Sequence, residues 1–379
     1  MFKRTIKEQI IGDFFKGKII IIAGPRQVGK TTLCEEIISD LGATRKIQKF
    51  NGDDPESNPK LSDKSLDFLK NLVSDADIVF IDEGQKIAGI GNTLKMLVDH
   101  YKESKQFVVT GSSSFNLLDN AEESLTGRKF VYFLYPMSLA EIKDEKNVLP
   151  ISKYRRDILI YGLYPKVVTL GSYAAKEREL RELISSYLYK DIFEFNDIKK
   201  SSVIVNLVKA LALQVGSEVS YSELAGMLGI NYKTVESYID LLEKNFIVFR
   251  LNPYFKNKRN EISKSKRKIF FYDTGVRNAA INNFQDFADR NDLGQLWENF
   301  VVAERVKFQK YNSLNSLNYF WRTYDGAEID WVEERGGKIF GYEIKWNVLA
   351  VKKAPPSWEK YGNSEFKIIT PENLEGFIF

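Results

Sequence analysis

A run near the amino terminus fits the pattern GxxxxGK[ST] at every fixed position: Gly24, Pro25, Arg26, Gln27, Val28, Gly29, Lys30, Thr31 and Thr32. A β-branched segment at 18–23 precedes it, and a segment typical of a helix follows at 31–39. Glycines let the backbone wrap a phosphate, so that amide N–H groups and the positive end of the helix point at it. Lys30 is then expected to reach the β- and γ-phosphates, and Thr31 to hold Mg²⁺. The run therefore predicts a nucleotide-binding protein.

Length and composition limit what else the chain contains. Its 379 residues exceed one ordinary core, so two or three domains are expected, and a net charge of +4 indicates that any nucleic-acid surface is local. The one cysteine, Cys34, allows neither an internal disulfide nor a cysteine-based zinc site, and the one histidine, His100, is interpreted as solvated. No apolar stretch reaches the roughly 18 residues that span a bilayer. These features favour the cytosol and predict no membrane partner.

Short aliphatic segments alternate with helical ones through the first third of the chain, which predicts a parallel sheet covered on both faces. The expected strands are 18–23, 46–50, 78–81, 107–110 and 130–134. The third ends in Asp82 and Glu83 at the edge where ligands of open α/β sheets bind. Asp82 suits Mg²⁺, and Glu83 suits orienting or deprotonating the attacking water. Carboxylates also end strands simply to stay solvated, but their combination with the phosphate loop favours catalysis.

Two further polar positions are candidates in the same region. Ser112 follows the fourth strand, which in a nucleotide-hydrolysing sheet lies between the other two motif strands, so its hydroxyl is expected to sense the γ-phosphate or the water. Arg128 follows Gly127 just before the last strand. An arginine of this kind either stabilises phosphoryl transfer in a neighbouring subunit or is a surface cation.

These motifs, together with the run Leu134-Tyr135-Pro136-Met137-Ser138, resemble in order and spacing the prokaryotic AAA-type ATPases that carry a C-terminal domain of unknown function. The resemblance implies an AAA-type ATPase core that uses ATP and Mg²⁺ in a homo-oligomer. It also implies that Ser112 is the sensor and Arg128 an arginine finger. Gly84 departs from the family, which more usually has an aliphatic residue there.

The middle of the chain predicts a helical lid followed by a helix-turn-helix. Residues 153–197 are rich in helix formers and are interrupted at 162–165, which also matches the family. A helix from Tyr221 is expected to stop at Gly229, and a second to begin near Asn231 with Val235, Ile239 and Leu242 on one face. A strand at 246–251 then suggests a wing. The module either reads DNA with Tyr232, Lys233 and Ser237 on its second helix or docks a protein.

A basic run at 256–268 lies where the wing tip is expected, with seven basic residues and one acidic one. Such a run is often only a solvated loop. Beside a helix-turn-helix, contact with DNA phosphates is the favoured interpretation, and it includes Lys264, Lys266, Arg267 and Lys268.

A second α/β pattern occupies the last third. A helix is expected at 292–310 with Glu298, then strands at 317–322, 327–333 and 339–346, a helix at 351–361 and a strand at 366–370. Asp330 lies on one strand, and Glu343 and Lys345 on the next share a face because they are two residues apart. Carboxylates in this arrangement bind Mg²⁺ and the lysine activates a water for phosphodiester attack, unless Lys345 merely offsets their repulsion.

The order Glu298, Asp330, Glu343 and Lys345 resembles the PD-(D/E)xK nuclease fold of restriction enzymes and junction resolvases. The sequence thus predicts an α/β protein in four parts: an AAA-type P-loop core at 1–145, a lid at 146–200, a winged helix-turn-helix with a basic wing at 201–270, and a restriction-endonuclease-like domain at 271–379. Its expected function is ATP hydrolysis coupled to engagement of DNA, and the nuclease resemblance adds metal-dependent cleavage of that DNA as a further expectation. The alternative is a nucleotide-controlled protein-interaction switch with an inactive nuclease-like scaffold.

Overall fold

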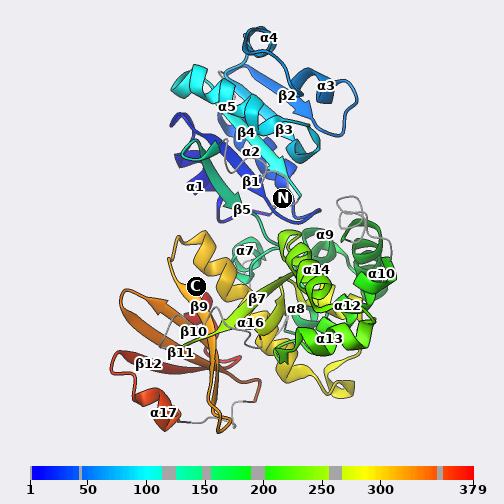
Figure 1. Ribbon diagram of the computed structural model, residues 1–379, viewed down its shortest axis with the longest axis vertical. Helices are drawn as coiled ribbons and strands as arrows, with labels where there is room; N and C mark the ends of the chain where they lie inside the picture. The colour runs from blue at the N-terminus through cyan, green and yellow to red at the C-terminus, as the bar shows by residue number, and fades with distance from the viewer. Residues whose placement is uncertain are drawn as a thin grey trace. The chain divides into compact units, whose positions relative to one another are not determined.

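A computed structural model describes residues 2–41, 45–112, 125–146, 155–188, 201–255, 267–347 and 353–379 (Figure 1). The chain divides into two compact units. The first comprises Met1–Pro136 with Lys244–Phe246, and the second comprises Met137–Glu243 with Ile247–Phe379. No helix within the described ranges combines the length and the apolar composition that crossing a membrane requires.

The first unit is built on a five-stranded parallel sheet in the order β2-β3-β4-β1-β5. Its strands are β1 Ile19–Ala23, β2 Ile47–Asn51, β3 Ile78–Asp82, β4 Gln106–Gly111 and β5 Lys129–Phe133. Its helices are α1 Lys7–Gly12, α2 Lys30–Leu41, α3 Ser57–Leu61, α4 Leu66–Leu72 and α5 Ile90–Tyr101, with short 3₁₀ turns at Gly84–Lys86 (η2) and Lys102–Ser104 (η3). All five expected strands are confirmed to within two residues.

The strand order brings the predicted motifs to one edge. Strand β1 is buried along its whole length, as expected for an unbroken β-branched run covered on both faces. Strand β4 lies between β1 and β3, which confirms the expected order. The carboxyl ends of the phosphate-loop strand, the Asp82 strand and the Ser112 strand therefore meet at the same edge.

The second unit contains a seven-stranded mixed sheet in the order β12-β11-β10-β9-β7-β8-β6. Its strands are β6 Glu218–Val219, β7 Val248–Pro253, β8 Arg267–Phe271, β9 Leu317–Arg322, β10 Glu328–Arg335, β11 Lys338–Ile344 and β12 Ser364–Ile369. Its helices are α7 Leu139–Lys146, α8 Arg155–Tyr161, α9 Pro165–Thr169, α10 Tyr173–Glu182, η6 Leu183–Leu188 (a π-helix), α12 Ser201–Leu213, α13 Tyr221–Leu228, α14 Tyr232–Lys244, α15 Thr274–Ala280, η8 Phe287–Asp289, α16 Leu293–Tyr311, α17 Pro356–Glu359 and α18 Glu375–Ile378.

Strands expected in two separate domains share this sheet. Strand β7 pairs antiparallel with β8 and parallel with β9, with Asn252 opposite Tyr319 and Pro253 opposite Phe320. The backbone hydrogen bonds of the expected wing strands thus continue into the expected C-terminal α/β region. The division of the chain into four domains stays a prediction.

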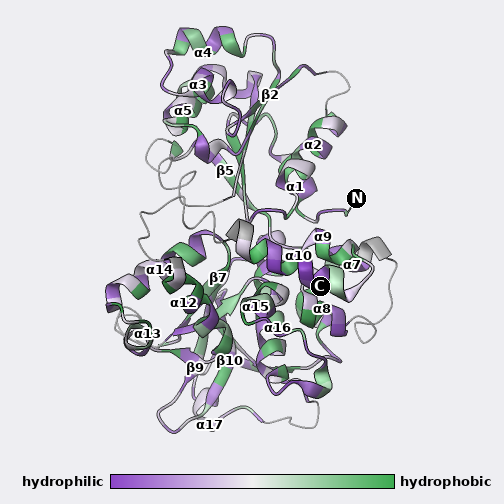
Figure 2. Cartoon of the chain, turned by 90° about the vertical axis from the view of Figure 1, so that its right-hand side faces the viewer, coloured by the Kyte–Doolittle hydropathy of each residue, from purple (hydrophilic) through white to green (hydrophobic). Residues whose placement is uncertain are grey.

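The expected pair of helices in the middle is present. Helix α13 ends at Gly229, whose φ of 65° lies in the left-handed region that glycine adopts without strain. Helix α14 follows after a short turn and buries Val235, Ile239 and Leu242, as its periodicity predicted. Figure 2 shows the matching alternation of hydrophobic and hydrophilic residues along α14.

Candidate active site

The phosphate loop connects β1 to α2 in a conformation that depends on glycine. Gly29 has a φ of 92°, and a Cβ on Gly24 would lie 2.0 Å from the carbonyl oxygen of Leu134. Both positions therefore exclude larger residues, one through its backbone angle and the other through a close approach. Gln27 also adopts a positive φ, of 62°.

Lys30 lies inside this loop. Its ammonium donates hydrogen bonds of 2.9 Å to the carbonyl oxygens of Gly24 and Pro25, and its side chain is buried. The loop thus holds the lysine amine at the centre of the turn that is expected to receive the phosphates.

Arg4 supports the loop from a position that the sequence did not reveal. Its guanidinium donates to the carbonyl oxygens of Val28 and Tyr135, each at 2.7 Å, and it is 5% exposed. Arg4 therefore ties the loop to the segment that follows β5. No local pattern distinguishes it from the other basic residues at the amino terminus, and only the long-range contacts identify it.

The phosphate loop and strand β3 meet through Thr31 and Asp82. The Thr31 hydroxyl lies 3.2 and 3.0 Å from the two carboxylate oxygens of Asp82. Thr110, at the end of β4, donates to Asp82 as well, and its oxygen accepts from the backbone N–H of Glu83 at 3.2 Å. Thr110 was not predicted as a site residue, although its place directly before Gly111 and Ser112 at a strand end is a usable signal.

Thr31 and Asp82 fit the magnesium ion that such a site takes with ATP. Mg²⁺ prefers oxygen ligands and is held in nucleotide sites by one or two protein groups, with phosphates and waters at the other positions. The described ranges contain no group of three or more His, Cys, Asp or Glu side chains that could hold a metal ion. Two protein oxygens match a site completed by the nucleotide.

Glu83 and Ser112 are joined by a residue that the sequence analysis did not single out. The amide nitrogen of Gln85 donates to the Glu83 carboxylate at 2.5 Å and to the Ser112 hydroxyl at 3.0 Å. Ser112 and Gln85 are both buried. The expected catalytic carboxylate and the expected sensor are therefore connected through one side chain.

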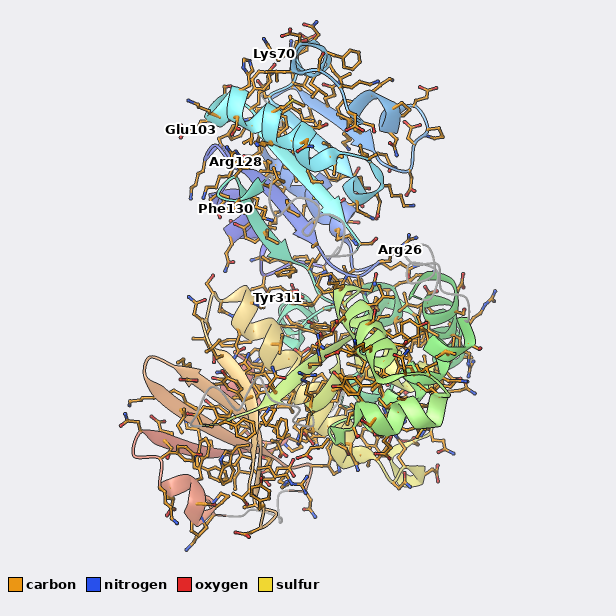
Figure 3. The ribbon with its side chains drawn as sticks, in the orientation of Figure 1. Arg26, Lys70, Glu103, Arg128, Phe130 and Tyr311 are labelled. Carbon is orange, nitrogen blue, oxygen red and sulfur yellow. The ribbon has the colours of Figure 1, made fainter. Side chains whose placement is uncertain are left out.

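Arg128 lies far from this edge. It precedes β5, whereas the phosphate loop follows β1, and the two strands run parallel with Ile19 opposite Lys129. Figure 3 accordingly shows Arg26 of the phosphate loop and Arg128 at opposite ends of the sheet. Arg128 is partly exposed and forms a 2.5 Å ion pair with Asp99.

The second unit gathers all four residues of the predicted nuclease centre. The Lys345 ammonium lies 2.7 Å from Glu343 and 3.7 Å from Asp330. Lys268, on β8, lies 3.1 Å from Glu298 and 3.6 Å from Asp330. Lys268 also lies 2.5 Å from Glu328, so three carboxylates surround its ammonium and two surround that of Lys345.

Burial governs the protonation of this cluster. Burial, outweighing the attraction of Lys268, raises the pKa of Glu298 to about 8. Burial and the neighbouring Asp330 raise the pKa of Glu343. Burial alone would lower the pKa of Lys268. The charges of Glu298, Asp330 and Glu328 raise it by more than burial lowers it, so the pKa of Lys268 lies above its ordinary value. The lysine is thus held charged among the carboxylates.

One expectation is corrected here, and another stays a prediction. Glu298, Asp330 and Glu343 were expected to bind Mg²⁺. Lys268 and Lys345 form ion pairs with these carboxylates, and the described ranges contain no group of three or more His, Cys, Asp or Glu side chains that could hold a metal ion. The magnesium site of this cluster stays a prediction. Lys268 was also expected to contact DNA phosphates, yet its side chain is 2% exposed. Lys264 and Lys266 lie outside the described residues.

The second helix of the helix-turn-helix, α14, has a shallow pocket at its start. Its amino-terminal part lines a shallow pocket of about 500 Å³ that includes Tyr232, Lys233 and Ser237, the three residues predicted to read DNA. Asn231 fixes the start of the helix by accepting hydrogen bonds from the backbone N–H and the hydroxyl of Thr234 at 2.8 and 3.0 Å. The predicted residues are therefore grouped on one surface.

Comparison with protein families agrees with the geometry of the first unit. Residues 16–143 match the family described as AAA domain. The match supports an AAA-type ATPase. We refer to these residues as the AAA domain. Residues 152–286 and 293–360 match two families that are each described as a domain of unknown function. Neither of these matches tests the likeness to nucleases.

Relatives extend over most of the chain. An uncharacterized protein of Mycobacterium tuberculosis is 28% identical over 335 residues, which cover 87% of this chain and 70% of the relative. An uncharacterized protein of Methanocaldococcus jannaschii is 27% identical and covers 84% and 73% of the two chains. Among solved structures, a DNA replication initiation factor aligns with a TM-score of 0.26 and 14% identity over 63% of this chain and 86% of that one. A TM-score at this level does not establish a common fold.

Proposed function

We propose that the AAA domain binds ATP with Mg²⁺ and hydrolyses it, and that the second unit engages DNA. The observation that carries the proposal is the contact of Thr31 with Asp82, because it brings the two expected magnesium ligands together at the edge where the phosphate loop ends. Lys30, buried in the loop, supplies a positive charge for the β- and γ-phosphates.

Each residue has a role in this reaction. The backbone amides of the loop and the start of α2 bind the phosphates, while Thr31 and Asp82 orient the ion that neutralises them. Glu83 accepts a hydrogen bond, and then the proton, from the attacking water. Ser112 contacts the γ-phosphate or that water.

We assign Arg128 to the site of a neighbouring copy of the chain. Its place at the other end of the sheet from its own phosphate loop excludes it from the site of its own subunit. An arginine supplied in trans stabilises the negative charge of the transition state. Hydrolysis then requires a homo-oligomer.

We further propose that the module of α12, α13, α14 and strands β6 to β8 acts as a winged helix on DNA. The element order and the pairing of β8 with both β6 and β7 support this assignment, together with the shallow pocket at the start of α14 that Lys233 and Ser237 line. We do not propose DNA cleavage, because Lys268 and Lys345 already form ion pairs with the carboxylates of the acidic cluster.

The experiment that tests this proposal combines two assays on the intact protein. ATP turnover is measured with Mg²⁺ and with EDTA, and binding of duplex DNA is measured at physiological salt. Magnesium-dependent turnover together with DNA binding supports the proposal. Turnover without DNA binding favours the alternative, a nucleotide-controlled switch that docks proteins, and absence of turnover contradicts the assignment as an ATPase.

A further inference from the structure

Gln85 lies beside the proposed reaction centre, in contact with Glu83 and Ser112. It belongs to the single 3₁₀ turn η2 that follows β3, and it is 8% exposed. Its amide nitrogen donates both to the Glu83 carboxylate and to the Ser112 hydroxyl. Since a carboxylate oxygen only accepts hydrogen bonds, the nitrogen must be the atom that faces Glu83.

Two local irregularities accompany these hydrogen bonds. The amide oxygen of Gln85 is buried and has no hydrogen-bond partner among the described residues. Glu83 itself adopts left-handed backbone angles, with φ 49° and ψ 43°. Both features cost stability and persist where the surroundings impose them, which is typical of residues held in a set direction for catalysis.

We propose that Gln85 is a positioning residue for ATP hydrolysis, which fixes the direction of the Glu83 carboxylate and links it to Ser112. This inference rests on the proposed function of the AAA domain. A shift of Ser112 toward the γ-phosphate changes the second hydrogen bond of the same amide nitrogen, so the occupancy of the nucleotide site is transmitted to Glu83. Gln85 itself need not contact ATP.

The variant Gln85→Met tests this role, because methionine keeps the length of the side chain and removes both hydrogen bonds. We expect kcat to fall at least about tenfold, short of the 10²–10⁴-fold contribution of a full general base, while KM for ATP stays within about twofold. Gln85→Glu should lower kcat further because it sets a second carboxylate against Glu83. Gln48→Met on the edge strand β2 is the matched control and should leave both constants unchanged.

The outcomes separate this role from the proposed function. If wild type hydrolyses ATP and the Gln85→Met variant has an unchanged or higher kcat, the role of Gln85 is overturned and the proposed function stands. A rise in the KM for ATP that is as large as the fall in kcat of that variant also overturns the role of Gln85, because this result indicates a damaged binding site. Wild type that fails to hydrolyse ATP overturns the proposed function, and the role of Gln85 with it.

A second, independent feature lies in the second unit. A pocket of about 510 Å³ is bounded by α16, strands β10 to β12 and the chain end, and its polar lining comprises Arg305, Arg335, Tyr342, Lys367 and Asn373. Among the described residues, no carboxylate side chain lines it. The pocket therefore presents three cations to whatever enters.

A buried carboxylate fixes the two arginines. Glu333, which is fully buried, accepts from Arg305 at 2.5 and 2.9 Å and from Arg335 at 3.1 Å. Arg305 also donates to the carbonyl oxygen of Phe377. These bonds engage three of the five N–H groups of Arg305, so two donors lack an acceptor among the described residues. Glu333 pairs with the two arginines, and Lys367 adds a third positive charge to the pocket lining, which leaves an excess of two positive charges.

We infer that this pocket binds a phosphate group. Planar guanidinium groups whose positions are already fixed suit an oxyanion, because two parallel N–H groups match two of its oxygens. The group can belong to free phosphate or to the phosphorylated end of a nucleic-acid strand, since both present the same oxygens.

The test measures binding of inorganic phosphate, of a 5′-phosphorylated oligonucleotide and of the same oligonucleotide with a 5′-hydroxyl, by calorimetry on the full chain. Arg335→Gln and Lys367→Ala should each lower the affinity for the species that binds at least about fivefold. Lys338→Gln, on the same sheet but outside the pocket, should leave this affinity unchanged. Preference for the 5′-phosphorylated strand identifies the nucleic-acid source, and binding of phosphate alone identifies the free anion. Equal affinity of the two oligonucleotides without phosphate binding, or unaltered binding in both variants, overturns the inference.

Discussion

The hydroxyl of Thr31 lies 3.2 and 3.0 Å from the two carboxylate oxygens of Asp82, 51 residues further along the chain. This contact joins the phosphate loop to strand β3. It exists because β4 inserts between β1 and β3 and aligns the carboxyl ends of all three strands.

Arg128→Ala should lower ATP turnover by about 10³-fold if the arginine acts in trans. Lys95→Ala, an exposed change on the helix that carries Asp99, is the control and should have no effect. The sharper measurement mixes Arg128→Ala with Lys30→Ala. Mixed oligomers contain sites with an intact loop from one copy and Arg128 from the other, so activity should return. Two variants that stay inactive together, or turnover that is unchanged by dilution to monomers, would show that Arg128 serves no neighbouring site.

Lys233→Ala should weaken duplex DNA binding for all sequences alike, because a lysine at the start of α14 contacts a phosphate. The slope of log affinity against log salt should decrease by about one. Lys209→Ala, exposed on the adjacent α12, provides the comparison and should leave the slope as in wild type. A slope equal to wild type in Lys233→Ala places the DNA contact elsewhere.

Lys268→Met should destabilise the second unit by about 3–5 kcal/mol, because it leaves buried carboxylates without their cation. Lys338→Met, which removes an exposed pair with Glu365, should cost less than about 1 kcal/mol. Urea unfolding measures both. We also expect no cleavage of duplex, branched or single-stranded DNA by wild type with Mg²⁺ or Mn²⁺. Metal-dependent cleavage that is lost in Asp330→Asn and Lys345→Ala would restore the nuclease interpretation.

The stability of the second unit should fall through Glu304 as the pH rises above 4.5, the ordinary pKa of this side chain. Burial raises the pKa of Glu304 above its ordinary value of 4.5, even though Lys307 opposes the change. The folded state therefore holds the proton more tightly than the unfolded state, and this contribution to stability is lost as pH rises from that value through the folded pKa. The loss is at most about 1.4 kcal/mol per pH unit. Urea titrations from pH 5 to 8 should show a smaller decline for Glu304→Gln than for wild type, and parallel declines would contradict the assignment.

The sequence predicted the strands of the first unit well because its signals are local. A β-branched run, a glycine turn and a helix start fix the loop, and Asp82 and Glu83 follow an unbroken apolar strand. Gln85, Thr110 and Arg4 escaped because their importance arises from partners up to 131 residues away in the sequence.

In the acidic cluster of the second unit, local sequence signals predicted only part of the site. Alternation along β10 and β11 correctly predicted that Asp330, Glu343 and Lys345 lie together. It did not predict that β8 brings Lys268 among them, because the pairing of β7 with β9 that joins the two parts of the sheet has no local sequence signal. A basic run that looked like a wing therefore ends in a buried lysine.

The most direct test of ATP hydrolysis by the AAA domain is single-turnover hydrolysis of ATP with Mg²⁺ by wild type, Glu83→Gln and Lys30→Ala, with ATP affinity measured alongside. Glu83→Gln should bind ATP as wild type does and hydrolyse it about 10²–10⁴-fold more slowly, because the water loses its base. Lys30→Ala should instead lose about 1.5–3 kcal/mol of binding free energy, roughly 10- to 150-fold in affinity. Hydrolysis by Glu83→Gln at the wild-type rate, with ATP bound equally well, would contradict the account.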